Sequence, residues 1–234
     1  MLDTQSMPTL LRPTIVWHVD VVKSRRAEYA EQTRNALLLA AAQAFAEHGF
    51  ASTSITQIAK SARVTKGAVY HHFSDKDALF EEVVKHYNAA AQADVHEAIA
   101  RHPDDAWGAA VAGLEATLDV CADPVAGRLI YLEGPIGLGW RRWRESERQY
   151  THDNLRRLLL SGVQAGIFRD DIASEAMTQL LAGMITHAGI ALAEAPARSR
   201  KRIRRDLQDA ILRVLRGLGG HEPPDAGRPG SNRA

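Results

Sequence analysis

The sequence predicts an all-α protein of about nine helices. Apolar residues recur at helical spacing from about Arg26 onward, and no segment shows the alternation of a half-buried strand. The chain also lacks the fixed-period repeat that a solenoid requires. With 45% hydrophobic and 24% charged residues among 234, it has a globular composition. This composition excludes a collagen-like or wholly disordered chain.

The first two helices have clear boundaries. Apolar residues from Ala36 to Phe45 lie on one face of the first helix. Gly49 follows, and glycine readily takes the left-handed conformation that ends a helix. Residues 52–54 (Ser-Thr-Ser) offer N-caps for a second helix, which carries Ile55 and Ile58 on its apolar face.

Two further helices follow after short joints. Thr65 is the expected N-cap of a short third helix that ends near Phe73. Asp75 caps a long fourth helix that runs to about Arg101. Three helices with short joints fit a helix-turn-helix behind a supporting first helix. In that motif the short helix enters the major groove of DNA, which is wide enough for one helix.

Proline, glycine and cap residues mark the later helices. We expect a start at Pro103–Asp105, breaks at Asp123-Pro124 and Gly134-Pro135, a helix from Trp143 to Gly166, and another from Asp171 to Glu194. The last helix follows Pro196, and its apolar stripe consists of Ile203, Leu207, Ala210, Ile211, Val214, Leu215 and Leu218.

The charge is unevenly distributed. Lys and Arg number 29 against 28 Asp and Glu, so the formal net charge is only +1. Residues 49–74, however, contain no acid and carry Lys60, Arg63 and Lys66. Because phosphate contacts depend on local charge, the near-neutral total does not exclude DNA as a partner.

Several features predict a cytoplasmic protein. Cys121 is the single cysteine, so the chain has no internal disulfide or cysteine-rich zinc module. No run of apolar residues is long enough to predict a membrane span, and Asp3 argues against a signal peptide. Residues 1–25 are expected to be a flexible extension, although an arm that reaches DNA is an alternative. Residues 219–234, rich in Gly and Pro, are expected to be a disordered tail.

The expected third helix carries side chains suited to DNA. Lys66 can reach guanine or phosphate, and the small Gly67 and Ala68 let the backbone approach the bases. Tyr70 offers a hydroxyl to phosphate, whereas His72 could equally pack against the first helix. The other candidate donors, mostly at the start of the second helix, are Thr53, Ser54, Thr56, Gln57, Thr65 and His71.

The segment AFAEHGFASTSITQIAKSARVTKGAVYHHFSDKDALFEEVV resembles the N-terminal domain of the TetR/AcrR family of bacterial transcriptional regulators. The matching pieces, in order, are Phe45 to Phe50, Thr53-Ser54-Ile55, Ile58-Ala59, Val64 to Gly67, Tyr70 to Phe73, and Lys76 with Leu79. The resemblance implies phosphate contact at Tyr70 and anchoring of the DNA backbone at Lys76. It implies base contacts at Thr56, Lys66, Gly67, Ala68 and His71.

One residue departs from the pattern of this family. Arg63 stands in the turn before the third helix, where family members often have glycine. A positive φ there costs arginine on the order of 1 kcal/mol more than glycine. Either the turn is adjusted, or Arg63 compensates with a phosphate contact.

The resemblance also implies the remaining organisation. Residues 26–90 would be the DNA-binding domain, and residues 91–218 a larger helical domain that binds a small-molecule effector and pairs two subunits. The last two helices are the expected homodimer elements, and the first of them is rich in small residues. The expected partners are thus an operator in double-stranded DNA, a second copy and an unknown effector, with no cofactor, metal or membrane.

Large or adaptable side chains of the middle helices are candidates for the effector pocket. They are Trp107, Tyr131, Trp140, Trp143, Met177, Met184 and His187. The Gly- and Pro-rich segment 133–140 is expected to be a mobile pocket wall. Residues 94–133 have a net charge of −6, which could favour a cationic ligand but more often indicates a solvated face.

The sequence thus favours a repressor that an effector releases from its operator. No catalytic motif for hydrolysis, phosphoryl transfer or dinucleotide binding is present, so we do not expect an enzyme. An architectural DNA-binding dimer without a ligand is the alternative.

Overall fold

The computed structural model describes residues 25–172 and 175–219, and helices dominate this part of the chain. They are α1 (Arg25–His48), α2 (Ile55–Ser61), α3 (Lys66–His72), α4 (Lys76–Ala100), α5 (Ala106–Ala122), η1 (Arg128–Glu133), α6 (Gly134–Gly137), α7 (Trp140–Glu147), η2 (Arg148–His152), α8 (Asp153–Gln164), η3 (Asp170–Ile172), α9 (Glu175–Glu194) and α10 (Ala197–Gly217). The all-α prediction is confirmed for these residues, where β geometry is limited to one isolated bridge between Phe168 and Gly219. The expected extension and tail lie outside the described residues, apart from Arg25 and Gly219.

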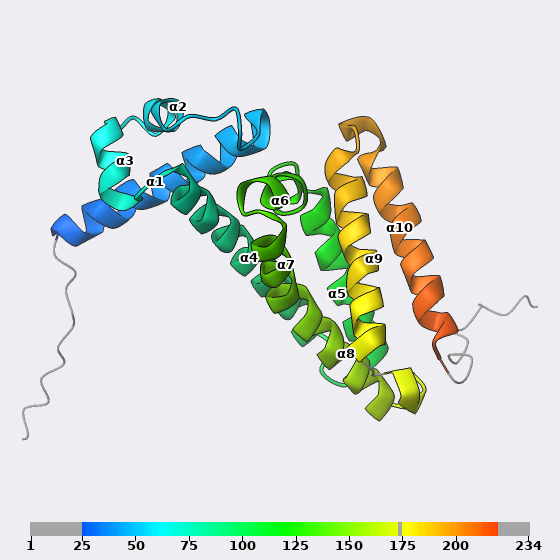
Figure 1. The fold of residues 1–234 in the computed structure, drawn as a ribbon. Coiled ribbons are helices and arrows are strands. Elements are labelled where there is room, and N and C mark those ends of the chain that lie inside the picture. Colours follow the sequence, from blue (N-terminus) through cyan, green and yellow to red (C-terminus); the bar gives the residue numbers. More distant parts are fainter. Residues whose placement is uncertain (1–24, 173–174, 220–234) are drawn as a thin grey trace, which may run out of the picture.

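The helices form two groups that α4 connects (Figure 1). Helices α1–α3 gather at one end of the molecule, and α4 leads away from them along the remaining helices. Helix α5 occupies the middle of the second group, where it packs against α4, α8, α9 and α10. The structure therefore places a small three-helix unit at the end of a larger bundle.

The expected caps determine where the first helices begin. The Ser54 hydroxyl accepts the Gln57 N–H at the start of α2, and the Gln57 side chain returns the contact to the Ser54 N–H. Thr65 caps α3 through the Ala68 N–H, and Asp75 caps α4 through Ala78. Each cap satisfies a backbone donor that has no partner within its helix.

An aromatic cluster joins the two groups of helices. The Phe80 ring of α4 lies 5.0 Å from Phe45 of α1 and 4.8 Å from Phe50 in the loop after α1, measured between ring centroids. Phe45 and Phe80 are fully buried. A methyl group at Gly137 would collide with the Phe80 ring, so the backbone of α6 packs directly on α4.

Three expected boundaries are wrong. Gly134-Pro135 does not break the helical segment, because η1 continues directly into α6. Pro135 lies in the first turn of α6, where a backbone N–H would have no partner within that helix, so proline is tolerated. The expected helix from Trp143 to Gly166 begins at Trp140 and is interrupted by the π-helical turn η2. At the expected start at Asp171 there is a 3-10 turn, and α9 begins at Glu175.

Helix α9 is long and apolar enough to cross a membrane by length and composition alone, with a mean hydropathy of 1.4 in its most apolar window. Half of that window is buried inside the fold, where α9 packs against α5, α8 and η1. A core helix of a bundle passes the same test, so this property does not indicate a membrane span.

The Cys121 thiol is expected to resist alkylation in the folded protein. Its side chain is fully buried, and burial raises the pKa of the thiol to about 12. Because the thiolate is the nucleophile, iodoacetamide at about pH 8 should label the urea-unfolded chain and leave the folded chain unlabelled. Equal labelling rates in mass spectrometry would contradict this burial.

Candidate DNA-binding surface and interior cavity

Helix α3 presents an exposed, acid-free surface. Lys66, Gly67 and His71 are exposed, and the Tyr70 side chain is 48% accessible. The Lys66 ammonium lies 5.7 Å from the centre of the Tyr70 ring. A methyl group at Gly67 would meet only the Thr65 hydroxyl, at 3.8 Å. This arrangement leaves the backbone of α3 open to close approach by a partner.

Helix α2 packs against α3, and the start of α2 carries further candidate residues. Ser54, Thr56 and Gln57 are exposed, although Ser54 and Gln57 already bond to each other in the cap. Thr53 is 2% exposed, and its hydroxyl donates toward the carbonyl oxygens of Gly49 (2.8 Å) and Ala44 (3.1 Å). The prediction that Thr53 donates to phosphate is therefore wrong, because its side chain is buried within the fold.

Lys76 also acts inside the protein. Its ammonium donates hydrogen bonds to the carbonyl oxygens of Phe50 (2.9 Å) and Thr53 (3.1 Å), and it lies 4.4 Å from the centre of the Phe50 ring. These contacts hold the loop between α1 and α2. Lys76 thus has contacts within the fold, and the phosphate contact that the resemblance implied stays a prediction.

Replacing Lys76 by methionine is expected to lower the free energy of unfolding by about 2 kcal/mol. The variant loses charged hydrogen bonds to two carbonyl oxygens and keeps most of the apolar stem. Urea denaturation followed by circular dichroism measures this difference. Unchanged stability together with weaker DNA binding would instead indicate that Lys76 contacts DNA.

Arg63 and His72 border the candidate surface. Arg63 has φ +56°, and it is the one non-glycine residue with positive φ among those described. The turn therefore keeps the backbone that usually favours glycine, and the exposed guanidinium remains available to a partner. Burial, with the nearby His71 and Arg34, lowers the pKa of His72, which favours its neutral form. His72 is half-buried beside α1 and is a weaker candidate for phosphate than Arg63.

A cavity of about 120 Å³ lies among α4, α5, α7, α8 and α9, with η1 also contributing to its wall. Three of the seven candidate pocket residues line it: Tyr131, Trp143 and Met184. The Trp143 indole donates a hydrogen bond to the Ile130 carbonyl oxygen (2.7 Å), which fixes this wall. A methyl group at Gly189 would overlap the Tyr131 ring, so α9 packs closely behind it.

The other four candidates do not line the cavity. Trp140 is 66% exposed, and His187 is also exposed. Trp107 lies beneath the Arg216 guanidinium, which is 5.7 Å from the centre of the indole ring, and Met177 packs against the apolar cluster of Leu159, Phe168, Ile172 and Leu181 without lining the cavity itself. Their positions depend on which face of each helix turns inward, and residue type does not encode that.

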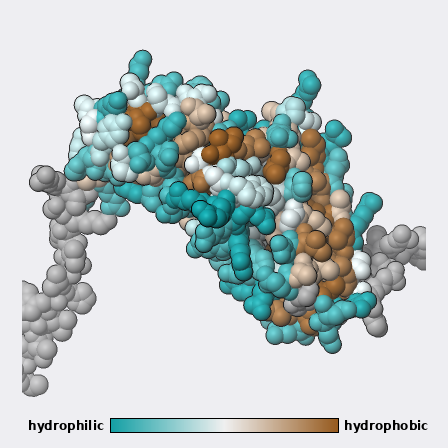
Figure 2. Space-filling view, viewed as in Figure 1, coloured by the Kyte–Doolittle hydropathy of each residue, from teal (hydrophilic) through white to brown (hydrophobic). Residues whose placement is uncertain are grey.

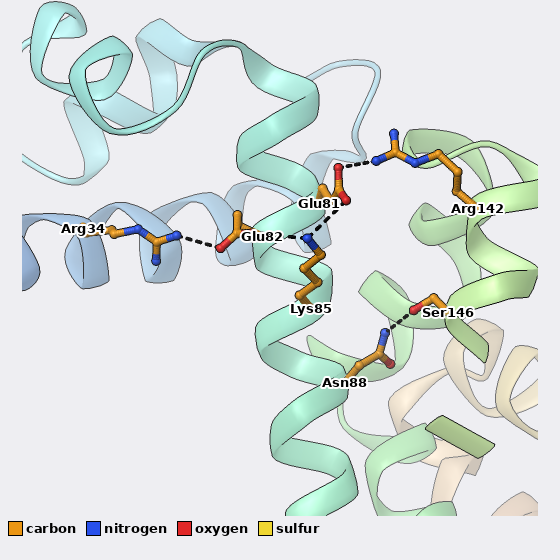
Figure 3. Close-up of polar contacts among 7 residues, drawn as sticks. All are labelled: Arg34, Glu81, Glu82, Lys85, Asn88, Arg142 and Ser146. Atoms are coloured by element: carbon orange, nitrogen blue, oxygen red, sulfur yellow. Dashed lines mark hydrogen bonds and ion pairs between the residues drawn. The ribbon is translucent and has the colours of Figure 1, made fainter. Parts of the chain in front are cut away.

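Polar contacts connect the cavity wall to the N-terminal helices (Figure 3). Arg34 of α1 pairs with Glu82 of α4 at 2.6 Å, and Arg142 of α7 pairs with Glu81. Lys85 lies between the two carboxylates, at 3.3 Å from Glu81 and 3.5 Å from Glu82. The Arg142 contact lowers the pKa of Glu81 and so favours its charged form. Exposed pairs like these contribute little stability, but they align α1, α4 and α7.

A second connection, between η1 and the loop after α1, runs through Glu133 and was not predicted from the sequence. This buried carboxylate on η1 accepts the Phe50 N–H at 2.8 Å and lies 3.6 Å from the Arg128 guanidinium. Arg128 in turn donates to the Ala46 carbonyl oxygen at 2.7 Å. Gly49, with φ +81°, leaves room for this carboxylate, since a methyl group there would approach Glu133 within 3.3 Å. Thus η1 both lines the cavity and holds the loop before α2.

Comparisons with known proteins identify this architecture. A model described as "Bacterial regulatory proteins, tetR family" matches residues 37–83, and one described as "Tetracyclin repressor-like, C-terminal domain" matches residues 107–218. The chain belongs to the TetR family of bacterial regulatory proteins. This family consists of transcriptional regulators and not of enzymes, which confirms the expectation that the chain is not an enzyme.

Two TetR-family relatives are similar to the chain in sequence. The HTH-type transcriptional repressor BepR of Brucella suis is 46% identical over 63 residues, which are 27% of this chain and 30% of BepR. The HTH-type transcriptional regulator AcrR of Shigella flexneri is 48% identical over 54 residues, 23% of this chain and 25% of AcrR. The chain therefore matches less than a third of each relative's length.

The structural likeness extends further. A TetR-family transcriptional regulator from Pectobacterium atrosepticum superposes with a TM-score of 0.68 at 26% identity, covering 84% of this chain and 98% of that one. The larger bundle is thus shared as a fold, whereas the closer sequence matches each span about a quarter of this chain. Within the described residues of this TetR-family chain, no group of His, Cys, Asp and Glu could hold a metal ion.

Proposed function

We propose that this chain is a sequence-specific DNA-binding repressor that a small-molecule effector releases from its operator. The exposed, acid-free surface of α3, open at Gly67, is the observation that carries the DNA-binding part. Helix α3 would enter the major groove with Lys66, Gly67, Ala68 and His71 toward the bases. Tyr70, Arg63, Thr65 and the exposed residues at the start of α2 would contact phosphate.

The cavity supports the effector part of the proposal. Its walls include η1 and α7. Glu133 of η1 contacts Phe50 in the loop after α1, and Arg142 of α7 contacts Glu81 of α4. An effector that binds better to a shifted arrangement of η1 and α7 would move α4 and the loop before α2. Such differential affinity changes the spacing of the two recognition helices and releases the DNA.

A homodimer through α9 and α10 completes the proposal. Figure 2 shows hydrophobic residues gathered along α9 beside α10, where Leu180 is 66% and Val214 44% exposed. Ala182, Ala188 and Gly189 are buried within the subunit, so the pairing would use the outward residues of α9. Residues 26–90 would form the DNA-binding domain, residues 91–218 the effector and dimer domain, and the protein would act in the cytoplasm.

Fluorescence anisotropy with DNA from upstream of the chain's own gene tests this function. We expect one fragment to bind at least about 1,000-fold more tightly than scrambled DNA, as specific sites do. Increasing salt should weaken binding steeply, because phosphate contacts release counterions. Equal affinity for both DNAs would overturn the proposal and favour an architectural dimer.

A further inference from the structure

Helix α7 directs one acidic side chain toward the cavity. Trp143, Ser146 and Glu147 are spaced i, i+3 and i+4, so they share one face of the helix, and all three line the cavity. The Ser146 hydroxyl accepts a hydrogen bond from the Asn88 amide of α4 at 3.1 Å, which fixes this part of the wall (Figure 3). Glu147 therefore reaches an interior that is otherwise mostly apolar.

One oxygen of Glu147 has no protein partner. The side chain is 10% exposed, and its Oε2 accepts the Arg144 Nη1 donor at 2.7 Å. The Oε1 atom is buried without a hydrogen bond. Burial raises the pKa of Glu147, and the Arg144 contact opposes that rise. A buried acceptor without a donor is unfavourable, so a ligand that supplies one gains affinity from this atom.

The rest of the lining determines which donor fits. Among the described residues it contains no Lys, Arg, His or Asp, so Glu147 is its one carboxylate there and no cation balances a second anion. A carboxylate or phosphate in the cavity would therefore be buried without a partner and repelled by Glu147. The aromatic rings of Tyr131, Trp143, Tyr150 and Phe168 also line the cavity, and ring faces attract cations.

We infer that the cavity binds an apolar organic cation, a lipophilic amine whose ammonium group donates to Oε1 of Glu147. The apolar part of the amine would lie among the leucine, isoleucine and aromatic side chains of the wall. The inference rests on the proposed function only where it makes this amine the effector, because binding in the cavity does not require DNA.

Three probes that differ only in their polar end test the inference. They are 4-phenylbutylamine, 4-phenylbutan-1-ol and 4-phenylbutanoate, titrated into the full chain at neutral pH by isothermal calorimetry. We expect the amine to bind at least roughly tenfold more tightly than the alcohol, as a charged hydrogen bond predicts, and the carboxylate to bind most weakly. This comparison within the unmodified protein decides the sign of charge that the cavity prefers.

The variant Glu147→Gln tests whether the Glu147 carboxylate binds the amine. It should weaken amine binding by roughly ten- to hundredfold and change alcohol binding by less than about threefold. Glu145→Gln is the matched control, because Glu145 lies on the same helix, is exposed and does not line the cavity. It removes the same charge and should leave amine affinity unchanged. Circular dichroism verifies that both variants fold.

Three results would overturn the inference: equal affinity for amine and alcohol, preference for the carboxylate, or no binding of the amine at about 1 mM. Measuring whether each of the three probes releases the operator DNA separates the cavity inference from the proposed function. If the alcohol or the carboxylate releases DNA and the amine does not, the repressor proposal stands and the assignment of the amine as effector fails. If the amine binds through Glu147 but the chain binds no specific DNA, the repressor proposal fails and the cavity inference stands.

Discussion

Replacing Gly67 by leucine is expected to weaken operator binding by roughly 100-fold without unfolding the protein. A leucine side chain at this exposed position of α3 would project into the space that the DNA bases must occupy. Loss of base contacts amounting to about 3 kcal/mol weakens binding by roughly 100-fold. Fluorescence anisotropy with the operator fragment measures the change in affinity.

The same variant should be at least as stable as the wild type. A Cβ atom at Gly67 meets only the Thr65 hydroxyl, at 3.8 Å, so the fold offers no obstacle. Leucine also favours a helix over glycine by up to about 1 kcal/mol. Urea denaturation measures this difference in the free energy of unfolding. Glu145→Leu, at an exposed position on α7, is the control that should bind DNA normally. Unimpaired operator binding by Gly67→Leu would contradict the insertion of α3.

Replacing Glu133 by alanine is expected to destabilise the protein by about 2–3 kcal/mol. The variant leaves the Phe50 N–H without its acceptor and removes the partner of Arg128. Arg128 is partly exposed, at 39% of its side chain, so its share of this loss is small. Urea denaturation of the wild type and the variant at the same protein concentration measures the difference.

Two variants separate the Glu133 contact from a general loss of charge. Glu133→Gln keeps an oxygen that can accept the Phe50 N–H, so it should retain about half of the lost stability. Glu145→Ala removes an exposed acid from α7 and should change stability by less than about 0.5 kcal/mol. If Glu133→Ala were as stable as the wild type, η1 would not hold the loop before α2.

Local signals in the sequence were sufficient for the starts of α2, α3, α4 and α5. Ser54, Thr65, Asp75 and Asp105 are all N-caps in the structure, because a side-chain acceptor three residues ahead of a free N–H needs no distant contact. At Arg63 the resemblance left open whether the turn is adjusted, and the positive φ shows that it is not.

The direction of polar side chains was not predictable from residue type. Thr53 and Lys76 suit phosphate as well as they suit a carbonyl oxygen, and only packing turns them toward the loop after α1. Glu133 and Glu147 belong to the irregular stretch of η1, α6, α7 and η2. The π-helical turns there shift the helical face, so the 3.6-residue period no longer shows which residues lie inside.

The central claim is that this chain reads a specific DNA site as a symmetric dimer. Incubating the full chain with fragmented DNA from its own genome and sequencing the bound fragments at about 0.15 M salt tests it most directly. The account predicts strong enrichment of one two-fold-symmetric motif, upstream of the chain's own gene or an adjacent one, that Gly67→Leu does not enrich. Bound fragments without a common motif, or the same motif with Gly67→Leu, would contradict it.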